Sequence, residues 1–233
     1  IYLSGYASRD SKSEGVYQDL FVKALAIRDD EGSVAVIVTS DLLYFDAAIL
    51  DPVEERLARE AELRPEQIFV TASHTHCGPI IRQKDADLYG RLDEPYLDEI
   101  RDALVSVVVD AVANLSPGSA QYHRTRCDIN VNRRVMTPGG VQMRPNPAGV
   151  IDRDVDIVTV SDPEGRMRAV LFGYACHATT MGGQLIGGDY PGVAQRVIQA
   201  AYPGAEAMFM QGCAGDLRPN NVDENGGFKS GPI

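Results

Sequence analysis

The sequence predicts an α/β fold with a mixed central sheet, helices flanking it, and an active site at the carboxyl-terminal ends of the strands. Two observations support this prediction. Short apolar runs typical of strands alternate along the chain with segments whose apolar residues recur at helical spacing. Small and polar residues then follow directly after several of the apolar runs. A chain of 233 residues can bury one sizeable core, so we expect a single domain over residues 1–233.

The first expected strands lie in the N-terminal third of the chain. Residues 20–27 and 33–41 are apolar runs separated by the turn sequence RDDEG, which predicts a strand pair. Residues 66–74 contain the run QIFVTA and predict a further, buried strand. Together they give the first half of the expected sheet.

Helical spacing occurs in three segments. Residues 51–63 are expected to form a helix, with Asp51 as its N-cap and Pro52 in its first turn. Residues 92–115 have apolar residues three and four positions apart and give the clearest helical pattern. Residues 191–202 form the last predicted helix.

Further strands are expected in the second half of the chain. A strand follows the Pro-Gly turn within residues 117–132, and the Pro-, Gly- and Arg-rich residues 133–149 are expected to form a loop. Residues 154–177 predict a hairpin with its turn at DPEG, and residues 205–212 predict a final strand.

Composition narrows the function classes. The net charge of −11 argues against nucleic acid and anionic membrane surfaces as partners, because both require a basic patch. Apolar runs stay well short of the roughly 18–20 residues of a transmembrane helix. The four cysteines have no CxxC spacing, which argues against a zinc ribbon. We expect each of them to be a small, buried hydrophobic side chain: Cys77, Cys127, Cys176 and Cys213.

Ionisable side chains gather where four of the predicted strands end. Ligands of α/β folds bind at the carboxyl ends of strands, so these groups are expected to share one crevice if the strand ends converge. They are Asp41, His74, His76, His177 and Asp216.

The sequence SHTHCGP places two histidines one residue apart after a strand. Residues two apart in an extended chain point to the same side, so His74 and His76 can face one point while Cys77 points away. Imidazoles converging with carboxylates are typical zinc ligands, and His177 is in a similar position after another strand. The remaining histidine, His123, lies within a predicted strand and is expected to be structural or exposed.

Six motifs in order carry a resemblance to a known family. They are SHTHCGP, DINVNRR, DRDVDIVTV, GYACHATTMGG, GGDYPGVAQ and QGCAGDLRPN. With the opening LSGYASR, the chain resembles the N-terminal catalytic region of the neutral/alkaline, non-lysosomal ceramidases. That resemblance implies a zinc-dependent hydrolase of an N-acyl amide, a role in sphingolipid metabolism, and an extracellular or periplasmic location. The implied partner is a small-molecule amide or a lipid substrate.

The resemblance also implies roles for individual residues. His74 and His177 match the family's zinc-binding histidines, and His76 matches an active-site histidine that contacts substrate or water. Arg133 matches an arginine that faces the substrate. The residue pattern itself allows both His74 and His76 as ligands.

Two further groups complete the expected site. Asp216 is a candidate proton-transfer residue, with a turn or cap residue as the alternative. Gly188 and Asp189, in the sequence GGDYPG, are candidate substrate-binding residues in an anion-binding turn at the start of a helix; capping of that helix by Asp189 is the alternative.

The sequence departs from the family pattern in two ways. The family's other zinc ligands, a glutamate and a tyrosine, lie further along than this sequence extends, so we expect a fragment that binds zinc weakly and has little hydrolase activity. Local substitutes for those ligands are Asp41, Asp189 and Asp216. Secondly, Arg218 stands where the family's GDVSPN-like motif has a serine implicated in catalysis.

The expected mechanism therefore does not depend on serine. A zinc-activated water attacks the amide carbonyl, a carboxylate or His76 moves protons, and Arg133 holds the oxygen on which charge develops. The alternatives are an inactive metal- or ligand-binding protein on the same scaffold and a metal-dependent hydrolase of another amide or ester. Arg218 predicts a substrate with a carboxylate or phosphate, unless this side chain turns to solvent or pairs with Asp216.

Overall fold

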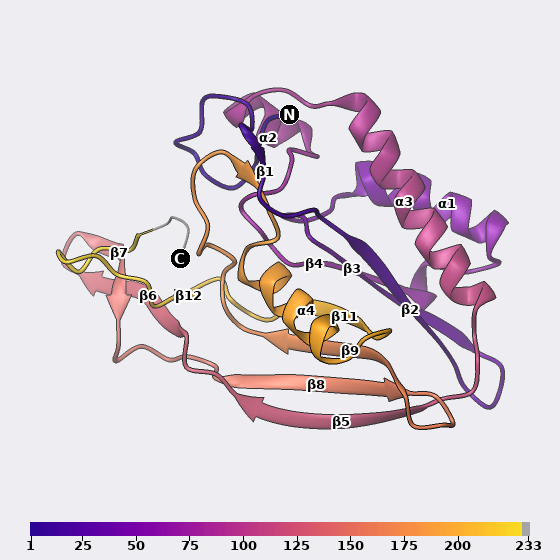
Figure 1. Cartoon of the computed structure of the whole chain (residues 1–233). Helices are drawn as coiled ribbons and strands as arrows, with labels where there is room; N and C mark the ends of the chain where they lie inside the picture. The colour runs from indigo at the N-terminus through magenta and orange to yellow at the C-terminus, as the bar shows by residue number, and fades with distance from the viewer. Residues whose placement is uncertain (230–233) are drawn as a thin grey trace.

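Two mixed sheets and the helices that cover them make up most of the fold (Figure 1). The computed structural model describes residues 1–229. In one sheet the order is β2-β3-β4, with β2 antiparallel and β4 parallel to β3. Its strands are β2 (Val22–Arg28), β3 (Val34–Ser40) and β4 (Ile68–Ala72).

The other mixed sheet has the order β11-β9-β8-β5. Its strands β9 and β11 are parallel, and the remaining neighbours are antiparallel. The strands are β5 (Ser119–Arg126), β8 (Asp154–Ser161), β9 (Met167–Tyr174) and β11 (Glu206–Gln211). The prediction of an α/β fold is thus confirmed, but the single central sheet is wrong, because β11 lies against β3 and β4 yet forms its hydrogen-bonded ladder only with β9.

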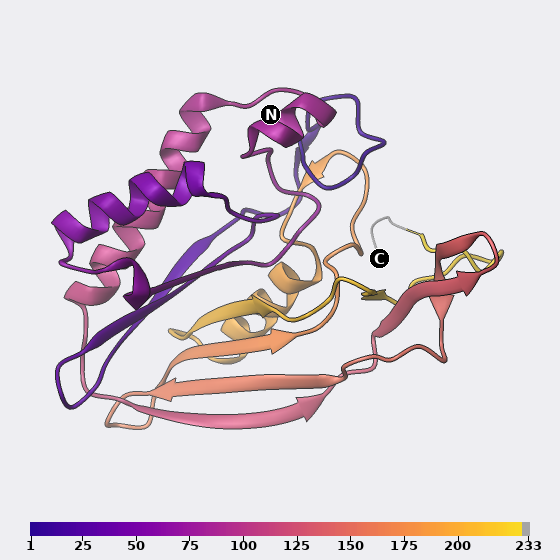
Figure 2. The ribbon, with the colours of Figure 1, turned by 180° about the vertical axis from the view of Figure 1, so that it is seen from behind.

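Two smaller sheets complete the strand inventory of residues 1–229. One is the parallel pair β1 (Gly15–Val16) and β10 (Leu185–Ile186). The other has the order β12-β6-β7 and contains β6 (Asn130–Thr137), β7 (Gly140–Asn146) and β12 (Leu217–Pro219). Figures 1 and 2 show this second sheet extending away from the rest of the molecule.

The β6–β7 hairpin corrects the expected loop over residues 133–149. Its turn is the sequence PGG, where Gly140 has φ +105° and Thr137 Oγ1 donates to the Gly140 carbonyl at 2.7 Å. Pro145 does not exclude a strand here, because β7 is at the edge of its sheet and needs no amide donor on its outer side.

Helices cover the two mixed sheets in different places (Figure 2). The structure contains α1 (Ala47–Glu60), α2 (Gln83–Tyr89), α3 (Glu94–Ala113) and α4 (Asp189–Ala201), together with the 3₁₀ turn Pro65–Gln67. Of these, α2 and the 3₁₀ turn were not expected from the sequence. Within the described residues 1–229, no helix is long and apolar enough to cross a membrane.

The start of α1 is earlier than expected. Asp46 takes the N-cap position in place of Asp51, and Pro52 lies inside the helix. Proline cannot donate to the carbonyl four residues back, which is that of Ala48. That carbonyl instead accepts a hydrogen bond from Arg101 Nη2 of α3 at 3.2 Å, which satisfies it and makes the proline tolerable.

The hydrophobic core has two main parts. Helices α1 and α3 pack on the β2-β3-β4 sheet through side chains such as Leu57, Leu104 and Val38, which are at most 1% exposed. Helix α4 packs on β9 and β11, where Phe172 and Phe209 meet edge to face at 5.3 Å between ring centroids. Each part thus anchors strands whose C-terminal loops form the site described below.

Candidate metal centre

Three loops that follow strands are joined by hydrogen bonds at one end of the fold. The loop after β4 is tied to the segment between β9 and α4: Thr75 Oγ1 donates to the Gly187 carbonyl at 2.8 Å, and the His76 amide donates to the Ala178 carbonyl at 3.3 Å. The loop after β11 approaches as well, because the Ala214 carbonyl accepts from His177 Nδ1 at 2.7 Å, and Leu217 at the start of β12 accepts the His177 amide at 3.2 Å through its carbonyl. These contacts bring two distant parts of the sequence together around histidines.

His74, His76 and His177 converge on one point. Their candidate ligand atoms all lie within 4.8 Å of one another. The convergence was predicted, but its expected cause was not correct: β4 ends at Ala72, and His74 has a left-handed φ of 61° and is therefore not extended. The backbone turn at His74, and not strand alternation, thus sets the direction in which the two rings of this loop point.

The nitrogen atoms of His74 and His177 are arranged as metal ligands would be. Nδ1 of His74 is 2.8 Å from the Leu43 carbonyl, and Nδ1 of His177 is 2.7 Å from the Ala214 carbonyl. Since a carbonyl only accepts, each neutral ring carries its proton on Nδ1 and has a lone pair on Nε2. Those two Nε2 atoms are 3.1 Å apart.

Two lone pairs facing each other at this distance repel unless a cation lies between them. Ligand nitrogens of tetrahedral zinc, each about 2.0–2.1 Å from the metal, lie roughly 3.3–3.4 Å apart. The observed 3.1 Å is close to that spacing. The residues present therefore fit a metal ion bound through the Nε2 atoms.

His76 supplies the third imidazole of the cluster. Both of its ring nitrogens are buried and have no hydrogen-bond partner within residues 1–229. The ring packs against Tyr6, with 4.9 Å between ring centroids, and its back touches Gly5. A Cβ atom at Gly5 would lie 2.6 Å from His76 Cγ, so this glycine allows the backbone to pass directly behind the ring.

Burial keeps all three imidazoles neutral. Burial, together with the neighbouring His74, lowers the pKa of His76 to about 3. Burial also lowers the pKa of His177 to about 4, with the Ala214 carbonyl opposing and the Arg133 guanidinium contributing. The pKa of His74 is lowered by burial in the same way. Neutral imidazole is the form that binds metals, so the cluster is ready for an ion at neutral pH.

Arg133 of β6 reaches the same cluster. Its Nη2 atom is 3.4 Å from His177 Nε2 and donates to the Gly215 carbonyl at 2.8 Å. Its amide donates to the Asp216 carbonyl at 2.7 Å, while the exposed Asp216 carboxylate accepts from Asn132 Nδ2 at 2.9 Å. The structure thus places Arg133 at the histidines and Asp216 beside Arg133.

Carboxylates do not join the histidines within the described residues. Among the described residues, the group with metal-ligand spacing contains only the three imidazoles. The carboxylates expected to replace the family's other zinc ligands are therefore not part of it; they are Asp41, Asp189 and Asp216. The buried Asp41 carboxylate instead accepts from the Phe21 amide and from Gln195 Nε2. Burial raises the pKa of Asp41 above its usual range.

Asp189 holds the loop that follows His177. This residue is fully buried, with φ 56°, and its carboxylate accepts from the Thr180 amide, Thr180 Oγ1, the Met181 amide and the Tyr190 amide. Gly188, and not Asp189, is the N-cap of α4. A carboxylate with four such partners stabilises the loop, and substrate contact by Gly188 and Asp189 stays a prediction.

Sequence reasoning missed Arg9, which supports the site from behind. It is 7% exposed, and its Nη1 donates to the carbonyls of His76 and Ser4, while its Nε donates to Gly183 at 3.0 Å. The only signal in the sequence is the opening GYASR, where Gly5, Tyr6 and Arg9 are close together. A short polar segment of this kind does not reveal contacts with loops more than 60 residues away.

Arg218 is buried in β12, with 8% of its surface exposed, so the alternative in which it turns to solvent is wrong, and substrate binding by Arg218 stays a prediction. Its guanidinium carbon lies 4.3 Å from the centroid of the Phe228 ring. Among the other sequence predictions, His123 is exposed on β5, as expected. Of the four free cysteines, Cys77 and Cys176 are buried as predicted, Cys127 is half-buried, and Cys213 is exposed, contrary to prediction.

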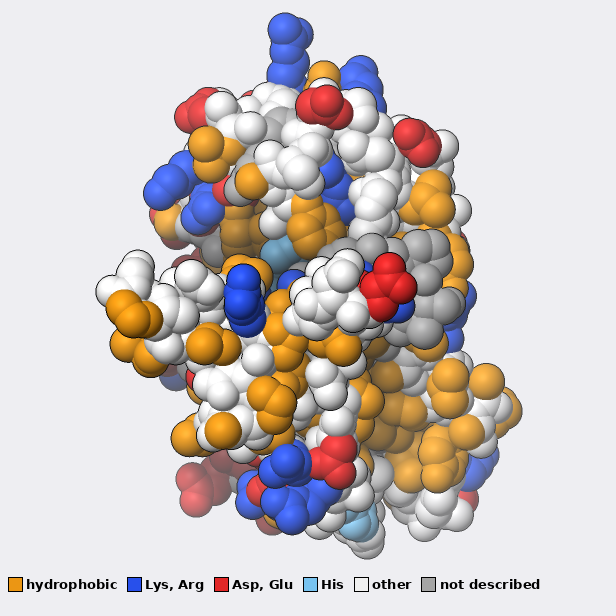
Figure 3. Space-filling model, turned by 90° about the vertical axis from the view of Figure 1, so that its left-hand side faces the viewer, with side chains coloured by type: hydrophobic (Ala, Val, Ile, Leu, Met, Phe, Trp, Pro, Cys, Tyr) orange, Lys and Arg blue, Asp and Glu red, His pale blue; other side chains and the backbone are white. Residues whose placement is uncertain are grey.

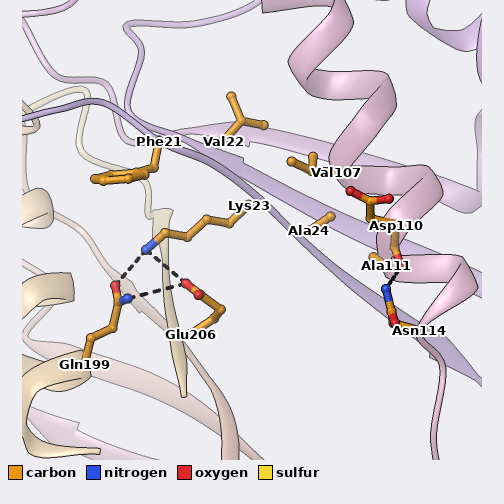
Figure 4. Close-up of a pocket in the computed structure, with 10 residues that line it drawn as sticks. All are labelled: Phe21, Val22, Lys23, Ala24, Val107, Asp110, Ala111, Asn114, Gln199 and Glu206. Carbon is orange, nitrogen blue, oxygen red and sulfur yellow. Dashed lines mark hydrogen bonds and ion pairs between the residues drawn. The ribbon is translucent and has the colours of Figure 1, made fainter. Parts of the chain in front are cut away.

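The face of the molecule in Figure 3 shows histidine atoms at the bottom of a hollow, next to basic side chains. A separate cleft of about 570 Å³ lies between β2, α3 and α4 (Figure 4). Its half-buried Lys23 donates to Gln195, Gln199 and the Ala207 carbonyl at 2.7–3.2 Å, beside Glu206. With all three protons used, Lys23 links the two mixed sheets and is not available for chemistry.

An α/β scaffold with three converging, neutral imidazoles defines a candidate metalloprotein. Residues 1–227 match the family described as neutral/alkaline non-lysosomal ceramidase, N-terminal. The chain therefore belongs to this family, as its motifs predicted.

Named relatives and solved structures agree with the assignment. The chain is 24% identical to neutral ceramidase A of Dictyostelium discoideum and 25% identical to neutral ceramidase of Mycobacterium tuberculosis, over 94% and 93% of its length. Those alignments cover 33% and 37% of the relatives, so the chain spans about a third of their length.

The fold is shared with solved ceramidases. The structure of neutral ceramidase from Pseudomonas aeruginosa matches with a TM-score of 0.82 at 22% identity, over 97% of this chain and 38% of that one. A ceramidase complexed with C2 matches with a TM-score of 0.80 at 23% identity, over 94% of this chain and 36% of that one.

Proposed function

We propose that the chain carries the metal-binding part of a zinc-dependent hydrolase that cleaves an N-acyl amide of the ceramide type. The observation that carries this proposal is the pair of Nε2 lone pairs, on His74 and His177, that face each other at 3.1 Å. Membership of a family named for ceramidases supports a lipid amide as the substrate class. Three imidazoles without a carboxylate suit zinc better than calcium or magnesium, which prefer oxygen ligands.

In this proposal His74 and His177 hold the zinc ion through Nε2. Their Nδ1 hydrogen bonds to backbone carbonyls fix both ring orientations, so the loops and not the metal determine where the ligands point. The bound ion supplies an activated water molecule at neutral pH.

In this proposal three side chains act on the reacting amide: Arg133, His76 and Asp216. The Arg133 guanidinium, already within 3.4 Å of His177 Nε2, donates to the carbonyl oxygen as negative charge develops. His76, neutral with a pKa near 3, is a hydrogen-bond partner for water or substrate. Asp216, which is exposed beside Arg133, is the proposed proton-transfer residue.

The test measures zinc content and amide hydrolysis together on the full-length protein. His76→Ala should keep its zinc but lose about a hundredfold or more in kcat/KM toward a short-chain ceramide. His123→Ala is the matched control, because this fourth histidine is exposed on β5 and should leave both quantities unchanged.

Other results would identify the alternatives. Zinc binding without turnover of any amide or ester would favour an inactive binding protein on the same scaffold. Turnover of esters or other amides, with ceramide untouched, would keep the metal chemistry and reject the substrate. Loss of zinc in His76→Ala would make His76 a third metal ligand.

A further inference from the structure

The β6–β7 hairpin exposes an apolar face. Met136 is opposite Val141 in its register, and Arg134 is opposite Met143. Residues opposite each other share a face of a sheet, as do residues two apart along a strand, so these four side chains are on one face. The exposed fractions of Met136, Val141 and Met143 are 78%, 55% and 54%. Large apolar side chains gathered in this way mark a surface that meets another molecule or a membrane.

The charge of this part of the chain is opposite in sign to that of the whole. Residues 129–151 contain three arginines and no aspartate or glutamate, although the chain has a net charge of −11. Two of these arginines, Arg134 and Arg144, are exposed and form no ion pair within residues 1–229. The net charge of the chain therefore does not exclude an anionic membrane surface as a partner of this hairpin.

The hairpin leads away from the candidate metal centre. Arg133 of β6 has its Nη2 atom 3.4 Å from His177 Nε2. A strand rises about 3.3 Å per residue, so the backbone of Met136 is about 10 Å from that of Arg133 along β6. Figure 3 faces the side toward which this sheet projects in Figure 1, and hydrophobic and basic side chains surround the hollow with histidine atoms at its bottom. A membrane that meets the hairpin would thus lie close to the mouth of the site.

We propose that the exposed face of the β6–β7 hairpin docks the protein on the surface of an anionic lipid bilayer. Its three apolar side chains enter the boundary between headgroups and acyl chains, and Arg134 and Arg144 reach the anionic headgroups. This inference rests on the proposed function, because it names the membrane that presents a lipid amide to the same site.

A protein partner fits this face less well. A stable protein–protein interface buries about 800 Å² on each partner, through roughly 20–30 residues. The strand β6 has 8 residues, of which the first three are buried, and β7 has 7, so the hairpin offers fewer. Membrane contact needs only a few apolar side chains with basic ones beside them.

Vesicle binding by the full-length protein tests the inference. Vesicles made of equal parts of phosphatidylcholine and phosphatidylglycerol are compared with vesicles of phosphatidylcholine alone, and the bound protein is measured by flotation. The wild type should bind the anionic vesicles about tenfold or more tightly than the neutral ones, and high salt should reduce this preference.

Substitutions of matched size test the apolar face. The triple variant Met136→Gln/Val141→Thr/Met143→Gln should bind both kinds of vesicle about tenfold or more weakly than the wild type. All three side chains are more than half exposed, so the fold should tolerate these changes, and circular dichroism checks it. Val197→Thr, at an exposed valine of α4, is the control and should bind like the wild type.

Charge and turnover are tested separately. Arg134→Gln/Arg144→Gln should remove the preference for anionic vesicles and leave binding to neutral vesicles unchanged. The triple variant should hydrolyse a short-chain ceramide in solution at the wild-type rate. It should hydrolyse ceramide embedded in vesicles about tenfold more slowly, because less of the protein is bound.

Wild-type protein that binds neither kind of vesicle, or a triple variant that binds both like the wild type, would overturn the inference. A dimer that the triple variant abolishes, in protein that does not bind vesicles, would also overturn it and make a second copy the occupant of this face. Vesicle binding requires neither metal nor turnover. A protein that docks on vesicles but hydrolyses no amide would therefore reject the proposed function and keep the membrane-docking surface.

Discussion

At the scale of single residues, the site depends on where each imidazole keeps its proton. The carbonyls of Leu43 and Ala214 hold the protons of His74 and His177 on Nδ1, which leaves both Nε2 lone pairs facing the same point. Nothing in the residue types alone reveals this, since the two carbonyls belong to backbone 31 and 37 residues away. The HxH spacing predicted where the site is, whereas the tautomer of each histidine depends on backbone carbonyls that only the fold brings to the ring.

The depressed pKa of His76 predicts how stability changes with pH in the metal-free protein. Folded His76 has a pKa of about 3, whereas the unfolded chain takes up the proton near the ordinary value of about 6.5. The contribution of neutral His76 is therefore complete above pH 6.5 and is lost as the pH falls from about 6.5 toward 3, on the order of 1 kcal/mol per pH unit.

Chemical denaturation between pH 7.5 and 4 measures this effect. The free energy of unfolding of the wild type should fall more steeply below pH 6.5 than that of His76→Gln, which cannot titrate. His123→Gln, at an exposed histidine on β5, should follow the wild type. Parallel curves for the wild type and His76→Gln would mean that His76 is not desolvated.

At the scale of elements, loops after strands form the site, and helices were easier to predict than loops. The helix α3 lies within the predicted range because its apolar spacing is regular, and its N-cap Asp93 accepts the Tyr96 amide. The β6–β7 hairpin was missed, because a segment rich in Pro, Gly and Arg has the composition of a loop although its ends pair. Similarly, the left-handed His74 cannot be recognised from an apolar strand pattern.

The loop at Gly5 gives a prediction at this scale. Gly5→Ala places a Cβ atom 2.8 Å from the backbone Cα of His76, a clash that side-chain rotation cannot relieve. Zinc affinity should fall about tenfold or more as the loop carrying His74 and His76 shifts. Competition with a chromogenic chelator measures that affinity.

Gly32→Ala is a close control for backbone strain. Gly32 has φ +90°, nearly equal to the +94° of Gly5, but no atom lies within 4 Å of its would-be Cβ. This variant should lose about 1 kcal/mol of stability with unchanged zinc affinity. Equal zinc affinities in both variants would show that Gly5 does not position His76.

At the scale of the whole molecule, two mixed sheets bring the strand ends together without forming one sheet. The sequence predicts the strands and their order along the chain, but not that β11 lies against β3 and β4 while pairing only with β9. Such packing depends on long-range contacts such as those of the half-buried Lys23, which joins β2 to α4 and β11. The family resemblance pointed to the histidines of the site but did not predict this packing.

The central claim is that His74 and His177 together bind one metal ion. The most direct test is the zinc content of the full-length protein, measured by mass spectrometry after dialysis against zinc and then metal-free buffer. The account predicts one zinc ion per chain in the wild type and in His123→Ala, and less than about a tenth of that in His74→Ala and in His177→Ala. Stoichiometric zinc in either of the last two variants would place the metal elsewhere and contradict the account.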